Sequence, residues 1–231
     1  MKLNRVLIAS ALALLFAIAS SAQWNKKPYT EWSEKDAMKV LNDSPWCQTQ
    51  ALTVQSTGQE TGQSCPMENY DINFRVRFLS AKPTRQAIAR RMELSQKGSV
   101  PDQLAAQLKA FAAADFPDYI VITVSIDSEK ATALLQESTQ AFYKATLNQL
   151  KNDTYLAVGS QRVFIKEYQP PGKDGFGARY IFPRLVDGKP FITPEGGEVL
   201  FNSATHSGTG MVTLRTRYKI KDMVFEGKLE Y

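Results

Sequence analysis

Apolar and polar residues alternate strictly from Tyr70 to Leu79, which is the clearest pattern in the chain. Because successive side chains of a β-strand point to opposite faces, this alternation predicts a half-buried strand. Residues 119–126 are instead apolar on both faces, which is typical of an interior strand. The residues of the alternating strand that we expect to face the core are Ile72, Phe74, Val76 and Phe78.

Apolar residues at helical spacing predict several helices. Ser33 followed by Asp36 matches a capping box at the start of a short helix that ends near Pro45. Trp32 and Trp46 lie on either side of this helix, and we expect both indoles to be buried. Further helices are predicted over about 84–97, from a Ser99 cap to beyond Phe111, and from Ser128 to about Leu150 with a break near Ser138.

The last third of the chain has the pattern of strands and turns. Tyr155–Val158 and Arg162–Tyr168 flank Gly159-Ser160, a two-residue hairpin signal. Helices followed by strands predict an α+β fold, in which helices in the N-terminal two-thirds pack on one face of a mostly antiparallel sheet and a C-terminal antiparallel meander follows. The remaining strands are expected over about 46–54, 178–184, 198–204, 211–221 and 224–230.

The order of elements makes two further predictions. The strand at 119–126 follows two helices, so we expect a crossover connection to it from the strand at 70–79. No long linker or repeat divides the chain after residue 22, and residues 23–231 are therefore predicted to form one domain.

The first 22 residues have the pattern of a secretory signal peptide. Lys2 and Arg5 precede an uncharged run from Val6 to Ala19, and Ser20-Ser21-Ala22 offers small residues for cleavage. The apolar run is shorter than the roughly 20 residues that a spanning helix needs. We therefore expect an exported protein, periplasmic or extracellular, with no membrane span once the signal is removed.

Charge gives little indication of a partner. The chain of 231 residues has a formal net charge of +5, and loss of Lys2 and Arg5 with the signal lowers it by two, to +3. The basic residues are scattered among acids, which favours a mixed solvated surface over nucleic-acid binding. A protein or a polysaccharide stays open as the partner.

The two cysteines predict a structural disulfide. Cys47 and Cys65 are an even pair in a chain expected to reach an oxidising compartment. A bond between them would stabilise the fold by about 3 kcal/mol on the chain-entropy model. Two free buried thiols or a redox pair are the alternatives, although the spacing is unlike Cys-x-x-Cys.

No reactive constellation stands out, so we predict no catalytic, cofactor or metal site. His206 is the only histidine, and no partner for metal binding or nucleophile activation accompanies it. The glycines of 172–177 resemble a phosphate-binding loop, but a strand and no helix follows them, which favours a turn. Two carboxylate pairs, Asp115 with Asp118 and Glu195 with Glu198, are interpreted as solvated turn residues.

Residues Lys27 to Trp46 resemble the mature amino terminus of a group of uncharacterised exported bacterial proteins, some of which are labelled GWxTD-domain proteins. This resemblance covers about 20 residues. It implies an exported bacterial protein and carries no activity, cofactor or catalytic residue with it.

Three functional hypotheses follow. The leading one is a non-catalytic binding or envelope-associated domain, and the rival is a secreted hydrolase whose carboxylates meet only in the fold. A third is an anion or polysaccharide binder. It would use arginines that alternate with the apolar residues of two strands, namely Arg75, Arg77, Arg215 and Arg217.

The signal-peptide interpretation has a direct test. We expect protein recovered from the producing cells outside the cytoplasm to begin at Gln23, because cleavage after Ala22 fits the small-residue rule. Amino-terminal sequencing and intact mass measure this. Protein that still begins at Met1 and stays with cytoplasmic contents would contradict it.

Overall fold

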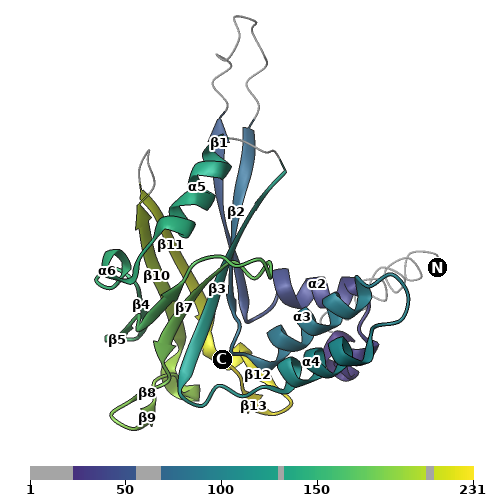
Figure 1. Cartoon of the computed structure of the whole chain (residues 1–231). Helices are drawn as coiled ribbons and strands as arrows, with labels where there is room; N and C mark the ends of the chain where they lie inside the picture. Colours follow the sequence, from purple (N-terminus) through teal and green to yellow (C-terminus); the bar gives the residue numbers. More distant parts are fainter. Residues whose placement is uncertain (1–22, 56–68, 130–132, 207–210) are drawn as a thin grey trace, which may run out of the picture.

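The computed structural model describes residues 23–55, 69–129, 133–206 and 211–231, so the predicted signal peptide lies outside the described residues. The chain combines α-helices with antiparallel strands, which confirms the α+β class (Figure 1). The α-helices are α2 (Glu34–Asn42), α3 (Lys82–Leu94), α4 (Asp102–Ala113), α5 (Ala133–Lys144) and α6 (Leu147–Leu150). Short 3-10 turns are η1 (Gln23–Lys26), η2 (Tyr29–Glu31), η3 (Pro194–Gly196) and η4 (Ile220–Asp222).

Most strands belong to two antiparallel sheets. Sheet A has the order β1-β2-β3-β7-β6, with β1 (Cys47–Gln55), β2 (Asn69–Phe78), β3 (Tyr119–Ser128), β7 (Ala178–Pro183) and β6 (Glu167–Gln169). Sheet B has the order β11-β10-β4-β5, with β11 (Met211–Lys219), β10 (Glu198–His206), β4 (Tyr155–Val158) and β5 (Gln161–Phe164). Two small hairpins pair β8 (Leu185–Val186) with β9 (Lys189–Pro190) and β12 (Val224–Phe225) with β13 (Lys228–Leu229).

The core lies between the two sheets and is built from their alternating inner residues. All four apolar residues predicted for β2 are buried, with exposed fractions of 0–1%. Sheet B meets them through Tyr218, whose ring packs edge-on against Phe78 at 4.8 Å between centroids. The Tyr218 hydroxyl donates a hydrogen bond of 2.9 Å to the Val76 carbonyl, so this buried polar group is satisfied.

Hydrogen bonds join the two sheets to each other at both of their edges. On one side the Gln50 amide bridges the edge of β11, donating to the Thr213 carbonyl and accepting from the Arg215 N–H, each at 2.8 Å. On the other side the chain runs from β5 into β6, where Ile165 N donates to Thr154 O and the next N–H donates to Ile181 O. Helix α5 packs against the core through Phe142, whose ring centroid lies 6.2 Å from that of Phe74.

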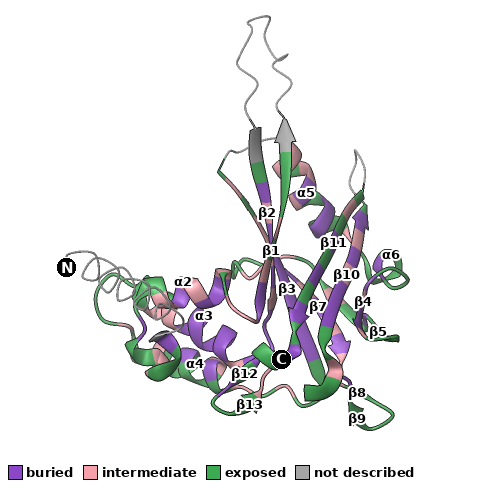
Figure 2. Ribbon diagram, turned by 180° about the vertical axis from the view of Figure 1, so that it is seen from behind, coloured by how far each residue is buried: buried purple, intermediate pink, exposed green. Residues whose placement is uncertain are grey.

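Helices α2, α3 and α4 lie on the opposite side of sheet A from sheet B, as Figure 2 shows. The predicted capping box is confirmed, because Ser33 and Asp36 exchange hydrogen bonds at the start of α2. Both predicted indoles are buried, with Trp32 at 0% and Trp46 at 1% exposure. They join a ring cluster with Trp24, and the Trp46 Nε1 donates to the Glu230 carbonyl, which ties the residue before β1 to the last residues of the sequence.

Several predictions of detail are wrong. Strand β3 pairs antiparallel with β2, so the two intervening helices make no parallel crossover. Helix α4 begins at Asp102 after Pro101, and no side chain caps it, so the Ser99 cap is absent. The break after α5 falls at 145–146 and not at Ser138, because Thr146 and a glutamine three residues on form a new capping box that begins α6. The Gly159-Ser160 hairpin is confirmed by the pairing of β4 with β5.

The pattern also did not reveal that the strands divide between two sheets. Strands β6 and β7 join sheet A, whereas β4, β5, β10 and β11 build sheet B. In the described part of the chain, no helix is long and apolar enough to cross a bilayer.

The start of α2 gives a prediction about pH. A hydrogen bond from Lys27 at 2.8 Å, followed by one from the Ser33 hydroxyl, lowers the pKa of Asp36 to about 2. A lowered pKa stabilises the fold at pH values above the unfolded pKa near 4, and the contribution is lost as the pH falls towards 2. We expect Asp36→Asn to lower the free energy of unfolding by about 1 kcal/mol at pH 7.

Urea unfolding at several pH values measures this effect. The difference between the parent chain and Asp36→Asn should shrink steadily from pH 5 to pH 2. A difference that is independent of pH would show that the charge of Asp36 contributes nothing.

Candidate functional site

A cleft of about 450 Å³ lies between the outer face of sheet A and helices α2 and α3. We call it the helix–sheet cleft and define the outer face as the side turned away from sheet B. Its floor is β2 and β3, and the loop at 174–176 forms one rim. A cleft of this size is in the usual range for small-ligand sites, about 300–1,000 Å³.

The register of sheet A places polar side chains on this floor. On β2, the residues between the four buried apolar positions are Asn73, Arg75 and Arg77. They pair across to β3 at Asp127, Ser125 and Thr123 respectively. Because paired residues of an antiparallel ladder share a face, the six side chains form one polar strip.

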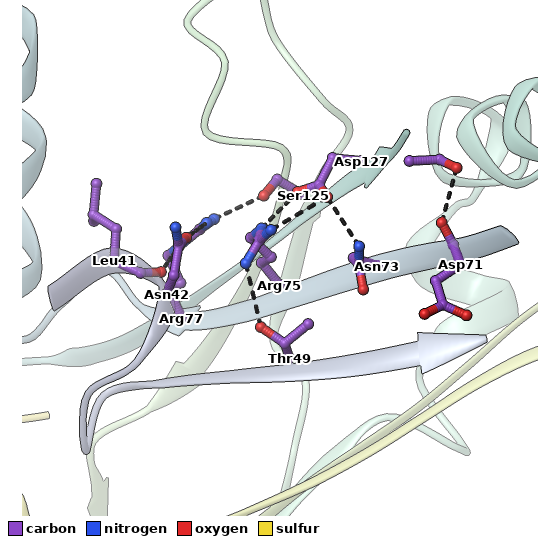
Figure 3. Close-up of polar contacts among 10 residues, drawn as sticks. Leu41, Asn42, Thr49, Asp71, Asn73, Arg75, Arg77, Ser125 and Asp127 are labelled. Carbon is purple, nitrogen blue, oxygen red and sulfur yellow. Dashed lines mark hydrogen bonds and ion pairs between the residues drawn. The ribbon is translucent and has the colours of Figure 1, made fainter. Parts of the chain in front are cut away.

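Arg77 lies under α2 and is held entirely by neutral acceptors. Its Nε donates to the Leu41 carbonyl at 2.6 Å, and its two terminal nitrogens donate to Ser125 Oγ at 2.7 Å and Asn42 Oδ1 at 3.2 Å (Figure 3). Burial lowers the pKa of the Arg77 guanidinium, because its charge is partly removed from water. An arginine nonetheless stays charged, so the floor has a positive charge that no directly bonded carboxylate balances.

Arg75 differs because it is paired with an acid. Its Nε and Nη2 donate to the two oxygens of Asp127 at 2.5 and 3.3 Å, and Nη1 lies 3.5 Å from Thr49 Oγ1 (Figure 3). Asn73 adds a hydrogen bond of 3.3 Å to the same carboxylate. The charges of Arg75 and Asp127 therefore offset each other.

The rim loop is held against β3 by a glycine. A Cβ on Gly177 would lie 2.0 Å from the Val124 carbonyl oxygen, and its φ is 83°, so only glycine fits there. This contact brings Asp174 to the rim, where Arg179 donates a hydrogen bond to it at 2.5 Å. Burial alone would raise the pKa of Asp174, but the hydrogen bonds from Arg179 and the Phe176 N–H outweigh it and the pKa is lowered.

The cleft also has apolar side chains. From α2, α3 and the rim loop they are Met38, Leu41, Ile88, Met92 and Phe176. Arg91 of α3 also lines the cleft, and its guanidinium has no hydrogen bond or ion pair to any described residue. The cleft thus combines apolar side chains with a partly buried cation at its floor and a second, unpaired cation on α3.

The structure separates the four arginines predicted as one binder. Arg75 and Arg77 lie on the outer face of sheet A, whereas Arg215 and Arg217 lie on the outer face of sheet B. His206 is exposed at the end of β10 and lies outside the helix–sheet cleft. The residues at 172–177 form a turn before β7, as their pattern indicates.

The carboxylate pairs that sequence suggested for hydrolysis do not lie in the cleft. Asp115, Asp118, Glu195 and Glu198 are all exposed and lie elsewhere on the surface. The acids that do line it, Asp127 and Asp174, were not singled out by their sequence context. Arg91 was also missed, although one signal marks it: it shares a helical face with Ile88 and Met92, where an arginine interrupts an apolar stripe.

Cys65 lies outside the described residues, so its predicted disulfide with Cys47 stays a prediction. The strand register sets a condition on it. Cys47 pairs with Arg77 and Gln55 pairs with Asn69, so Cys47 lies about 26 Å along the ladder from that last pair. The four residues from Cys65 to Asn69 span at most about 14 Å, and a disulfide needs Cα atoms within about 7 Å. Formation of the bond therefore requires the end of this ladder to open.

The chain matches no protein-family model, no curated protein and no solved structure. Across the residues that the structure describes, no group of three or more His, Cys, Asp or Glu side chains is arranged to hold a metal ion.

Cys47 provides a test of the packing beside the cleft. Its side chain is 3% exposed, and burial raises the pKa of the thiol, so little reactive thiolate forms at neutral pH. In a Cys65→Ser variant, we expect iodoacetamide to modify Cys47 about a hundredfold more slowly in the native protein than in urea. Mass spectrometry over time measures both rates, and equal rates would contradict the packing of β1.

Proposed function

We propose that the mature chain is an exported, non-catalytic binding protein whose helix–sheet cleft holds a small ligand with an acidic group and an apolar portion. The pattern of residues 1–22 and the resemblance of residues 27–46 to exported bacterial proteins support export, periplasmic or extracellular. The geometry of the cleft supports binding.

The observation that carries this proposal is the state of Arg77. Moving a guanidinium out of water costs several kcal/mol unless an opposite charge and full hydrogen bonding offset it. Arg77 makes three hydrogen bonds to neutral oxygens and also contacts the thiol of its strand partner Cys47, so no acid is bonded to any of the five N–H groups of its guanidinium. An anion in the cleft would complete this environment through charge-assisted hydrogen bonds, which are about twice as strong as neutral ones.

The other lining residues indicate the shape of such a ligand. Arg91 can supply a second positive contact to the same acidic group. The apolar side chains of Met38, Leu41 and Ile88 would then cover an apolar portion, which favours an amphipathic acid over a free inorganic anion.

The rival hydrolase has less support. A general acid at neutral pH needs a carboxyl group with a raised pKa, but the pKa of Asp174 is lowered. Asp127 and Asp174 each pair with an arginine, and their side chains are 49% and 37% exposed. Neither has the buried, unpaired setting that acid catalysis requires, so we propose binding without conversion of the ligand.

Calorimetry with the mature chain tests the proposal. Decanoate should bind, and its uncharged analogue 1-decanol should bind at least about tenfold more weakly, because only the acid can pair with the arginines. Inorganic phosphate should bind more weakly than decanoate because it lacks the apolar portion.

Two variants locate the site. Arg91→Gln should weaken decanoate binding about tenfold without changing stability, because the side chain is exposed and unpaired. Arg77→Met should abolish binding, and its melting temperature is measured alongside. Lys109→Gln on the exposed side of α4 is the matched charge control and should bind as the parent does. Equal affinity for decanoate and 1-decanol would contradict the proposal.

A further inference from the structure

The outer face of sheet B has a second, shallow depression of about 480 Å³. Most of its lining residues come from sheet B. Sheet B lies on the opposite side of sheet A from helices α2 to α4 (Figure 2). We call this depression the sheet B face. Its charged lining residues are Arg162, Arg215, Arg217 and Glu198.

Positive charge on the sheet B face is poorly balanced. Glu198 is the one acid that lines the depression, and it lies 3.7 Å from Arg217 with side chains 46% and 56% exposed. An exposed pair at this distance contributes little. The Arg215 side chain has no partner among the described residues, and Arg162 has only an aromatic contact, with its guanidinium 4.5 Å from the centre of the Tyr155 ring.

The register of sheet B sets the distance between the three arginines. Arg217 pairs with Leu200, which pairs with Ala157, which pairs with Arg162, so one row crosses all four strands. Three strand spacings separate the two arginines of this row by about 14 Å at their Cα atoms. Arg215 projects from the same face of β11 two residues away. A chain with repeated anionic groups can meet all three guanidinium groups at once without drawing them towards a single point.

The surface between Arg162 and Arg217 is apolar, and two aromatic rings lie beside Arg162. Leu200 and Ala157 form a floor that is only 8% and 9% exposed. Tyr155 packs edge-on with Phe164, whose side chain is 46% exposed although it is a large apolar group. Planar rings beside cations fit the apolar faces and acidic groups of charged sugars.

From these observations we infer that the sheet B face binds an acidic polysaccharide, with carboxylate or sulfate groups on Arg162, Arg215 and Arg217 and a sugar ring against Phe164. The open shape suits a polymer that continues past the site at both ends. This site and the helix–sheet cleft lie on opposite sides of the molecule and share no lining residue, so either can be occupied without the other.

The experiment measures binding of the mature chain to polygalacturonate and to dextran sulfate, with neutral dextran as the uncharged polymer. We expect at least one of the two acidic polymers to bind, dextran not to bind, and affinity to fall as salt rises. The result with each polymer distinguishes carboxylate from sulfate recognition. No binding to either acidic polymer overturns the inference.

Variants locate the site and separate it from the cleft. The triple variant Arg162→Gln/Arg215→Gln/Arg217→Gln should weaken binding at least about tenfold, because three charge-assisted contacts are lost. The control Lys35→Gln/Lys97→Gln/Lys109→Gln removes the same charge from exposed positions on the helical side and should bind within about twofold of the parent. Equal loss in both triple variants would leave only a non-specific charge effect and overturn the inference.

One further variant and one comparison of polymers identify the class of polymer that binds. Phe164→Ser should weaken binding of the acidic polysaccharide but not the weaker binding of poly-L-glutamate, because only the sugar contacts the ring. Tighter binding of poly-L-glutamate or of oligothymidylate than of either acidic polysaccharide would assign the face to a peptide or a nucleic acid. Arg91→Gln, which tests the cleft, should leave polysaccharide binding unchanged.

Discussion

Strand β2 presents apolar side chains to the core on one face and polar side chains to the helices on the other, and the rest of the structure depends on this alternation. Its apolar residues fill the core between the sheets, and this packing fixes its register with β1 and β3. A slip of one residue would move every side chain to the other face. Arg75 and Arg77 must therefore lie on the outer face, where α2 and α3 then cover them in part.

Covering an arginine is costly, and two of the described arginines, Arg85 and Arg77, show different outcomes. Arg85 in α3 is 3% exposed and bonds to the carbonyls of Leu79, Ser80 and Ala114, while its guanidinium lies 5.1 Å from the Phe116 ring centre. It joins α3 to the segments at 79–80 and 114–116, and it does not line the helix–sheet cleft. Arg77 is held by neutral oxygens in the same way but lines a cleft, so its charge can be met by a ligand.

The two outer faces of the pair of sheets are suited to different tasks. Sheet A has helices over its outer face, and the space that they leave is a cleft with both apolar side chains and the strip of polar side chains on β2 and β3. Sheet B has no such cover over Arg162, Arg215 and Arg217, so its basic residues remain spread over an open surface. The same alternation of strand residues thus produces a partly buried cation in one place and an exposed row of cations in another.

The sequence by itself determined the local features of this protein, because each depends on residues close together along the chain. The buried face of β2, the Ser33–Asp36 capping box, the Gly159-Ser160 hairpin and the α+β class are of this kind. Only the tertiary structure decided that Arg77 meets Leu41 and Asn42, and that Arg217 shares a row with Arg162. Those neighbours depend on which strands pair and which helix covers which face, and these choices follow from burial of the whole apolar surface at once. Periodicity shows the face on which a side chain lies, but it does not show what lies opposite that face.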